Sequence, residues 1–316
     1  MANKYSKSFP VVKLANGIDM PSIGFGCAEL PPSTIEAAVH AGLEAGYRFF
    51  DNAPFYRDEA EIGAALKSSG INREDLFVST KLPNESHDYE AALKRFDLSL
   101  KTMGLDYLDM YMIHFPCPQQ GKFTEAWKAL EKLHKDGLVR SIGVSNFTEG
   151  HLQKIFDKCE VRPVVNEIEC NPYFAQPALR KFCMDNDIHP IAWFPLGGPI
   201  AAIEEPLPGT FADGDPIAEI LAVIRTHNVG KKVLLKDQTA KAIGDKYGKT
   251  IAQVALRWHL QSNIIPIPKG GLNRLHENCN IFDFSLTPEE MKQMDALDHG
   301  RRLGPDPETS PMHNCT

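Results

Sequence analysis

The amino-acid sequence predicts an α/β protein with a single domain, a (β/α)8 barrel of the TIM type. Counted from Ser22, eight short apolar runs have the length and composition of strands, and a segment with helical periodicity follows almost every one. Alternating βα units imply a parallel sheet with right-handed crossovers. Eight such units in 316 residues fit a closed barrel better than an open doubly wound sheet. We therefore expect residues 1–316 to form one domain.

A hairpin is expected before the first of these units. Two short apolar runs within residues 11–21 flank the dipeptide Asn16-Gly17. Asn-Gly between two apolar runs is the strongest short-range signal of a hairpin. The hairpin lies outside the count of eight strands, so we expect it to close the floor of the barrel.

The first units of the barrel have clear local signals. Residues 22–26 predict a strand, and "PPSTIEAAVHAGLEAG" predicts a helix over 31–46, with Ser33 and Glu36 at the spacing of a capping box. A buried strand over 47–51 and a helix over 58–70, ended by Gly70, come next. The later strands are expected over 76–81, 108–114, 139–145, 163–169, 189–194 and 264–269, and the later helices over 88–104, 124–137, 148–159, 176–187, 239–248 and 250–262.

One long segment, residues 196–237, interrupts the alternation after the seventh strand. Its first half is rich in Gly and Pro, and residues 216–228 have helical periodicity. Long connections are uncommon in compact domains and often functional. Because it follows a strand, this one belongs to the C-terminal face, where barrel active sites lie. We interpret it as an enlarged loop that reshapes the site; simple decoration of the rim is the alternative.

Composition and net charge limit the kinds of binding partner and the cellular compartment that we expect for the protein. A net charge of −7 argues against nucleic acid or an anionic membrane as the main partner. No apolar run approaches a membrane span, and the first residues do not have the pattern of a signal peptide. The seven cysteines are odd in number and contain no Cys-x-x-Cys pair, so neither a disulfide framework nor a zinc site is indicated. We expect a cytoplasmic protein without a bound metal.

The predicted strand ends carry a set of acid–base side chains. Asp51, Lys81 and His114 end the second, third and fourth strands, and Tyr56 follows Asp51 on the next loop. Each has an ordinary alternative: a capping Asp, a solvated Lys, a core His, a packed Tyr. In a barrel, however, all four project toward one rim. There Asp51 could hold Lys81, whose ammonium favours the Tyr56 phenolate, while Tyr56 donates a proton and His114 orients a carbonyl.

Six motifs then give a resemblance that covers most of the chain. They are "GYRFFDNAPFY", "TKL", "LDYLDMYMIHFP", "GLVRSIGVSNF", "NEIECNPY" and "IPIPKGGLNRLHEN", in that order. With these motifs the sequence resembles the aldo-keto reductases, which are NADP(H)-dependent (β/α)8 oxidoreductases. The resemblance implies that Asp51, Tyr56, Lys81 and His114 form the catalytic tetrad. In such enzymes a hydride passes from the nicotinamide to a carbonyl carbon while the tyrosine protonates the oxygen.

The resemblance also implies contacts with the nicotinamide. Ser145 and Asn146 match the pair that binds its carboxamide. Glu167 stands where the family more often has Gln, which keeps an acceptor for the carboxamide NH2 but loses a donor. Trp193 occupies the position of the aromatic residue, commonly Tyr, that stacks on the ring.

At the adenosine end, Lys269 and Arg274 match the pair that binds the 2′-phosphate, and Glu277 with Asn278 the adenine contacts. A guanidinium suits a phosphate and has nothing to bind on a bare 2′-hydroxyl, so NADP(H) is the expected cofactor. Gly270 departs from the family's usual serine, and the segment from Lys269 to Arg274 is one residue short.

The substrate is expected to be a small molecule with a carbonyl group, bound by a monomer or weak dimer. Ala28, Phe55, Phe115 and the long loop are the expected lining of its pocket. Aldehydes, aldoses and sugar phosphates all remain open. The alternative function is a non-catalytic dinucleotide-binding member of the fold, either a regulatory subunit or a structural protein. The intact tetrad argues against it, because binding alone does not require activation of Tyr56 by Lys81 and Asp51.

Overall fold

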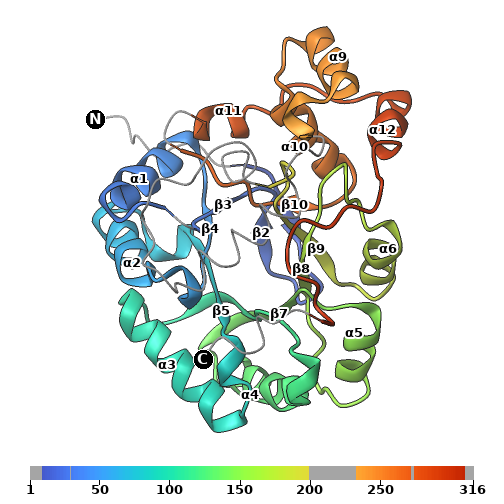
Figure 1. Cartoon of the computed structure of the whole chain (residues 1–316). Coiled ribbons are helices and arrows are strands. Elements are labelled where there is room, and N and C mark those ends of the chain that lie inside the picture. The colour runs from blue at the N-terminus through green and yellow to red at the C-terminus, as the bar shows by residue number, and fades with distance from the viewer. Residues whose placement is uncertain (1–8, 29, 199–232, 272–273, 310–316) are drawn as a thin grey trace, which may run out of the picture.

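The computed structural model describes residues 9–28, 30–198, 233–271 and 274–309. Eight parallel strands follow one another in chain order around a barrel, and helices surround them (Figure 1). The strands are β3 (Gly24–Gly26), β4 (Phe49–Asp51), β5 (Phe77–Leu82), β6 (Leu108–Ile113), β7 (Val139–Ser145), β8 (Val165–Glu169), β9 (His189–Trp193) and β10 (Ile265–Pro266). The predicted (β/α)8 barrel is confirmed.

Glycine allows the first and last strands to meet. The Gly26 amide donates to the Pro268 carbonyl at 3.2 Å and so links β3 to the chain just past β10. A Cβ atom on Gly26 would lie only 2.9 Å from the Ile267 carbonyl oxygen, which is closer than real Cβ contacts come. The absence of a side chain here lets the two backbones approach closely enough to close the barrel.

The N-terminal hairpin closes the barrel floor, as predicted. Strands β1 (Val11–Lys13) and β2 (Asp19–Pro21) pair antiparallel, and Gly17 has φ +84° in the turn between them. Leu14 and Met20 of the hairpin are buried in one apolar cluster with side chains of the barrel interior, including Phe49 of β4. Burial of this apolar surface fixes the hairpin against the strands.

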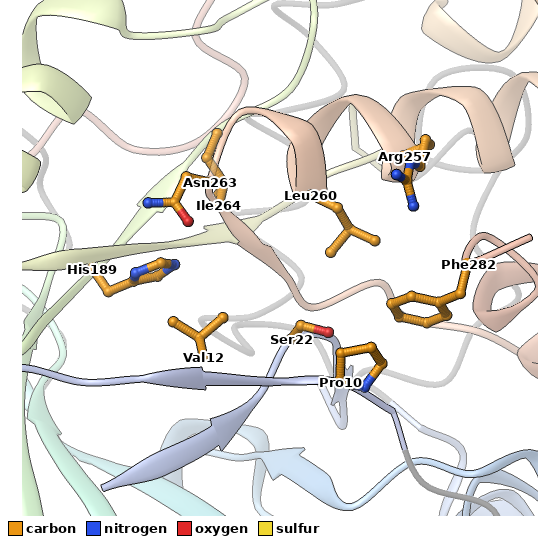
Figure 2. A pocket seen from close by; sticks show the side chains of 9 residues that line it. All are labelled: Pro10, Val12, Ser22, His189, Arg257, Leu260, Asn263, Ile264 and Phe282. Atoms are coloured by element: carbon orange, nitrogen blue, oxygen red, sulfur yellow. The ribbon is translucent and has the colours of Figure 1, made fainter. Parts of the chain in front are cut away.

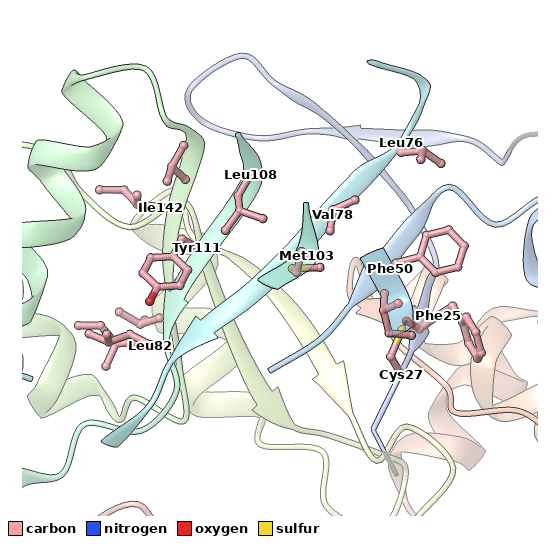
Figure 3. Close-up of a cluster of buried hydrophobic side chains, with 14 of the residues drawn as sticks. Phe25, Cys27, Phe50, Leu76, Val78, Leu82, Met103, Leu108, Tyr111 and Ile142 are labelled. Atoms are coloured by element: carbon pink, nitrogen blue, oxygen red, sulfur yellow. Dashed lines mark hydrogen bonds between the residues drawn. The ribbon is translucent and has the colours of Figure 1, made fainter. Parts of the chain in front are cut away.

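The helices bury apolar faces against the outside of the sheet. In α4, for example, Phe123, Ala126, Leu130 and Leu133 recur at helical spacing and are buried. Figure 3 shows part of this outer core, where Phe25, Val78 and other strand residues gather. The described helices are α1 (Ile35–Ala45), α2 (Glu59–Ser68), α3 (Tyr89–Met103), α4 (Phe123–Lys135), α5 (Glu149–Phe156), α6 (Pro177–Asp185), α9 (Gln238–Tyr247), α10 (Ile251–Gln261), α11 (Leu275–Cys279) and α12 (Pro288–Asp295).

The predicted capping box at Ser33 and Glu36 is wrong. The chain makes a 3-10 turn over Pro32–Thr34 before α1 begins, and Thr34, not Ser33, is the N-cap residue, without a side-chain capping bond. The Thr34 hydroxyl donates instead to the Pro31 carbonyl at 2.9 Å. Pro31 and Pro32 fix the backbone at this point, and the resulting turn displaces the helix start past Ser33.

Most of the enlarged loop lies outside the described residues. This applies to residues 199–232, and therefore to the helix expected over 216–228. Within the described part of the chain, no helix combines the length and apolar character needed to cross a membrane.

A pocket of about 230 Å³ lies at the floor of the barrel, between the hairpin and α10 (Figure 2). Val12 of β1, His189 at the start of β9 and Leu260 of α10 are among its lining residues. It lies at the N-terminal ends of the strands, so it is separate from the rim that carries the predicted catalytic side chains.

Candidate active site

The C-terminal ends of β4, β5 and β6 bring the four predicted acid–base residues together. Asp51 ends β4, Lys81 is the penultimate residue of β5, and His114 directly follows β6. Tyr56 reaches the same rim through the 3-10 turn Pro54–Tyr56. Its ring lies edge-on to the His114 ring at 6.3 Å between centroids, and the Lys81 ammonium is 5.8 Å from its centroid.

Lys81 is fully buried and shared between two carboxylates. Its Nζ lies 2.6 Å from Asp51 Oδ2 and 3.3 Å from Glu167 Oε1, and it donates to the Asn52 carbonyl at 3.1 Å. Burial lowers the pKa of the ammonium, but the charges of Asp51 and Glu167 more than offset this and raise it well above its usual range. Lys81 is therefore a cation at neutral pH.

Glu167 is a buried carboxyl beside Lys81. Burial and the charge of Asp51 raise its pKa to about 8, although Lys81 opposes the shift. Oε2 is buried and has no hydrogen-bond partner among the described residues. Buried polar atoms are normally hydrogen-bonded. The amide NH2 group of a bound molecule would be a suitable donor to this oxygen.

His114 is a neutral imidazole at neutral pH. Burial lowers its pKa well below the usual range, and the Lys81 charge acts in the same direction. The ring centroids of Phe55 and Phe115 lie 6.4 Å and 5.4 Å from that of His114. Ala28, half-buried, lies two residues past β3. The predicted aromatic lining thus stands beside His114.

Ser145, Asn146 and Trp193 hold one another. Trp193 Nε1 donates to Asn146 Oδ1 at 2.9 Å, and Asn146 Nδ2 donates to the Ser145 hydroxyl at 3.0 Å. The Ser145 hydroxyl in turn donates to the Glu167 carbonyl at 2.9 Å. This chain of bonds fixes the Trp193 indole and couples it to β7 and β8.

The residues expected at the adenosine end lie around α11. The side chains of Lys269 and Arg274 are exposed, and Glu277 Oε1 accepts from the Thr250 hydroxyl at 2.7 Å. Asn278 is buried, and its Nδ2 has no partner among the described residues. A Cβ atom on Gly270 would lie 3.4 Å from this Nδ2, so glycine keeps the space beside Asn278 open.

The C-terminal segment, for which the sequence predicted no role, also reaches this face. Leu303 and Gly304 donate their backbone amides to the Glu169 carboxylate. The sequence "RRLGPDPET" has no helical or strand periodicity to signal this contact. The one available signal was the glutamate itself, an acid near the end of a predicted buried strand.

Several known proteins are similar to this chain over nearly its whole length. A model of the Aldo/keto reductase family matches residues 22–299. The chain is 39% identical over 299 residues to morphine 6-dehydrogenase of Pseudomonas putida, with 94% of each chain covered. It is 37% identical to methylglyoxal reductase DkgA of Escherichia coli K12, over 94% of this chain and 97% of the relative. The crystal structure of a Bombyx mori aldo-keto reductase in complex with NADP superimposes with a TM-score of 0.80 at 30% identity, covering 94% of this chain and 95% of that one. The chain therefore belongs to the aldo/keto reductase family.

Proposed function

We propose that the protein is an NADP(H)-dependent reductase that acts on the carbonyl group of an aldehyde or aldose, with Tyr56 as the general acid. The observation that carries the proposal is the buried Lys81 ammonium, held at 2.6 Å by Asp51 and 5.8 Å from the Tyr56 ring. Membership of a family of carbonyl-reducing oxidoreductases supports the reaction type.

Two polar atoms of the site that have no hydrogen-bond partner in the described part of the chain fit a nicotinamide adenine dinucleotide. Glu167 Oε2 is an acceptor suited to the carboxamide NH2, and Asn278 Nδ2 is a donor suited to an adenine ring nitrogen. Lys269 and Arg274 add exposed cations near Asn278 for a 2′-phosphate. The NADP complex of the similar silkworm enzyme supports the same cofactor. When bound, NADPH supplies the hydride that the carbonyl carbon receives.

Residues of the chain supply the proton that the carbonyl oxygen receives during reduction. As negative charge develops on the carbonyl oxygen, Tyr56 transfers its phenolic proton to that oxygen and becomes a phenolate. The Lys81 ammonium favours the phenolate, and Asp51 with Glu167 keeps Lys81 in place. Neutral His114 donates a hydrogen bond that orients the carbonyl, and solvent returns the proton to Tyr56.

The substrate class is proposed from the shape and chemistry around His114. Phe55 and Phe115 present aromatic surface beside the imidazole, which suits short aldehydes and the carbon skeleton of aldoses, including sugar phosphates. The name of the methylglyoxal reductase relative supports small oxo-aldehydes within this class.

A steady-state screen tests the proposal. kcat/KM is measured with NADPH and with NADH over methylglyoxal, glyceraldehyde, aromatic aldehydes, aldoses and sugar phosphates. We expect NADPH to be oxidised by at least one of these classes of carbonyl compound. We also expect a higher kcat/KM with NADPH than with NADH. Tight NADPH binding without oxidation across the whole panel would instead support the non-catalytic dinucleotide-binding alternative.

A further inference from the structure

The C-terminal strap, which we define as residues 299–309, crosses the catalytic face of the barrel. It leaves α12, passes β8 and approaches α5 (Figure 1). At its start the amides of His299 and Arg301 both donate to the Tyr173 carbonyl at 3.3 Å. At its far end Glu308 accepts from the Thr148 hydroxyl, the N-cap of α5, at 3.1 Å. The strap is therefore anchored to the barrel on both sides of the site.

Between these anchors, one buried carboxylate grips the strap backbone. Glu169, at the end of β8, is 0% exposed. Its Oε1 accepts from the Leu303 amide at 2.7 Å and its Oε2 from the Gly304 amide at 2.8 Å. Desolvation of a carboxylate is unfavourable, and hydrogen bonds to backbone amides offset that cost. The Glu308 side chain is 52% exposed, so its contacts are weaker than those of the buried Glu169 carboxylate.

The hydrogen bonds from Leu303 and Gly304 to Glu169 also hold the strap backbone directly against Trp193. A Cβ atom on Gly304 would lie 2.2 Å from Trp193 Cη2, a distance that only a glycine permits. Trp193 Nε1 is fixed on its other side by Asn146 at 2.9 Å. The indole is thus held between the strap backbone and the residues that we expect to contact the nicotinamide.

We propose that Glu169 is a positioning residue of the active site, which holds the C-terminal strap against Trp193 and so determines the shape of the site on its substrate side. The carboxylate acts through Gly304 and does not touch the reacting atoms. The link to substrate binding rests on the proposed reductase function, whereas the grip on the strap stands on the contacts alone.

Glu169→Gln tests the grip. Glutamine keeps one acceptor oxygen, but its NH2 group faces a backbone amide donor, so at least one of the two bonds is lost. We expect the amides of Leu303 and Gly304 to exchange with deuterium about ten- to a hundredfold faster, since hydrogen bonds to charged groups are the strong ones. Exchange in α9 and α10 should not change. Glu290→Gln changes a buried glutamate whose side chain binds Lys246 and Tyr247 of α9 and not the strap; it is the matched control and should leave the strap protected.

The catalytic consequence is tested with a second variant. Gly304→Ala leaves the carboxylate intact but forces the strap away from Trp193. Both single variants should raise KM for larger aldehydes several-fold more than they change kcat, because the tetrad is untouched. The double variant should show less than the sum of the two effects, since both act through one contact.

Two outcomes would overturn the proposal. One is normal exchange protection of Leu303 and Gly304 in a folded Glu169→Gln variant. The other is an unchanged KM pattern in Gly304→Ala, which decides the matter even where Glu169→Gln does not fold. Because hydrogen exchange requires no turnover, a failed grip is distinguishable from a failed assignment of the reductase activity.

Discussion

The Lys81 ammonium lies 3.3 Å from Glu167 Oε1, so a second carboxylate joins Asp51 around one buried cation. The pKa of Glu167 is raised to about 8 by burial and by the Asp51 charge. Ionisation of Glu167 adds a negative charge beside the Asp51–Lys81 ion pair, and the shift of its pKa moves this ionisation upward, toward neutral pH.

This charge predicts a pH-dependent preference for the oxidised cofactor. The nicotinamide ring is cationic in NADP⁺ and neutral in NADPH, so an ionised Glu167 attracts only the former. As pH rises from 6 to 9, the ratio of the NADPH to the NADP⁺ dissociation constant should increase about tenfold, which corresponds to one pKa unit of interaction. Ionisation of the 2′-phosphate affects both nucleotides alike and cancels in the ratio.

Fluorescence titration of both nucleotides measures this ratio, and Glu167→Gln is the decisive variant. Glutamine cannot ionise, so its ratio should be flat across the same pH range. Glu61→Gln, an exposed change on α2, should keep the wild-type slope. A wild-type ratio that does not vary with pH would mean that Glu167 does not face the nicotinamide.

Replacement of the proposed acid should remove turnover but not cofactor binding. Tyr56→Phe deletes only the phenolic hydroxyl, and loss of general acid catalysis is expected to lower kcat about 10²–10⁴-fold. The NADPH dissociation constant should stay within about twofold. Single-turnover NADPH oxidation gives the first quantity and fluorescence titration the second. Tyr89→Phe, on the outer helix α3, serves as control; if Tyr56→Phe keeps most of its activity, another group is the acid.

Arg274 should decide between the two dinucleotides. Its exposed guanidinium is proposed to bind the 2′-phosphate, which NADH lacks. Arg274→Ala should weaken NADPH binding about ten- to a hundredfold, the range expected for a charged hydrogen bond, and leave NADH binding nearly unchanged. Lys292→Ala on α12 removes a distant exposed cation as the comparison. Equal losses for both dinucleotides would place Arg274 away from the phosphate.

Replacement of two helical glycines by alanine should have opposite effects on the stability of the fold. A Cβ atom on Gly63 of α2 would lie 2.1 Å from the Met103 carbonyl oxygen, so Gly63→Ala should destabilise the fold by about 1–3 kcal/mol. A Cβ atom on Gly150 of α5 would meet, among the described residues, only the Thr148 hydroxyl oxygen, at 3.9 Å. Gly150→Ala should therefore stabilise the fold by about 0.4–1 kcal/mol through its higher helix propensity. Urea denaturation measures the free energy of unfolding of both variants. If Gly63→Ala unfolds with the same free energy as the wild type, α2 and α3 can move apart to accommodate the added methyl group.

The sequence determined the features that depend on local pattern. Alternation of apolar runs and helical periods specified the eight βα units, and Asn16-Gly17 specified the hairpin. The position of Asp51, Lys81 and His114 at strand ends was readable for the same reason, because parallel strands in a barrel share one C-terminal rim. Even a local signal can fail, as at Ser33, where consecutive prolines imposed a 3-10 turn instead of the capping box.

Only the tertiary structure decided which side chains share an environment. Glu169 and Gly304 are 135 residues apart in sequence, and Lys81 and Glu167 come from the non-adjacent strands β5 and β8. No periodicity relates such positions, since their contact arises from closure of the barrel and from the path of the C-terminal strap across it. The raised pKa of Glu167 depends in turn on burial and on a neighbouring charge, and both exist only once the chain has folded.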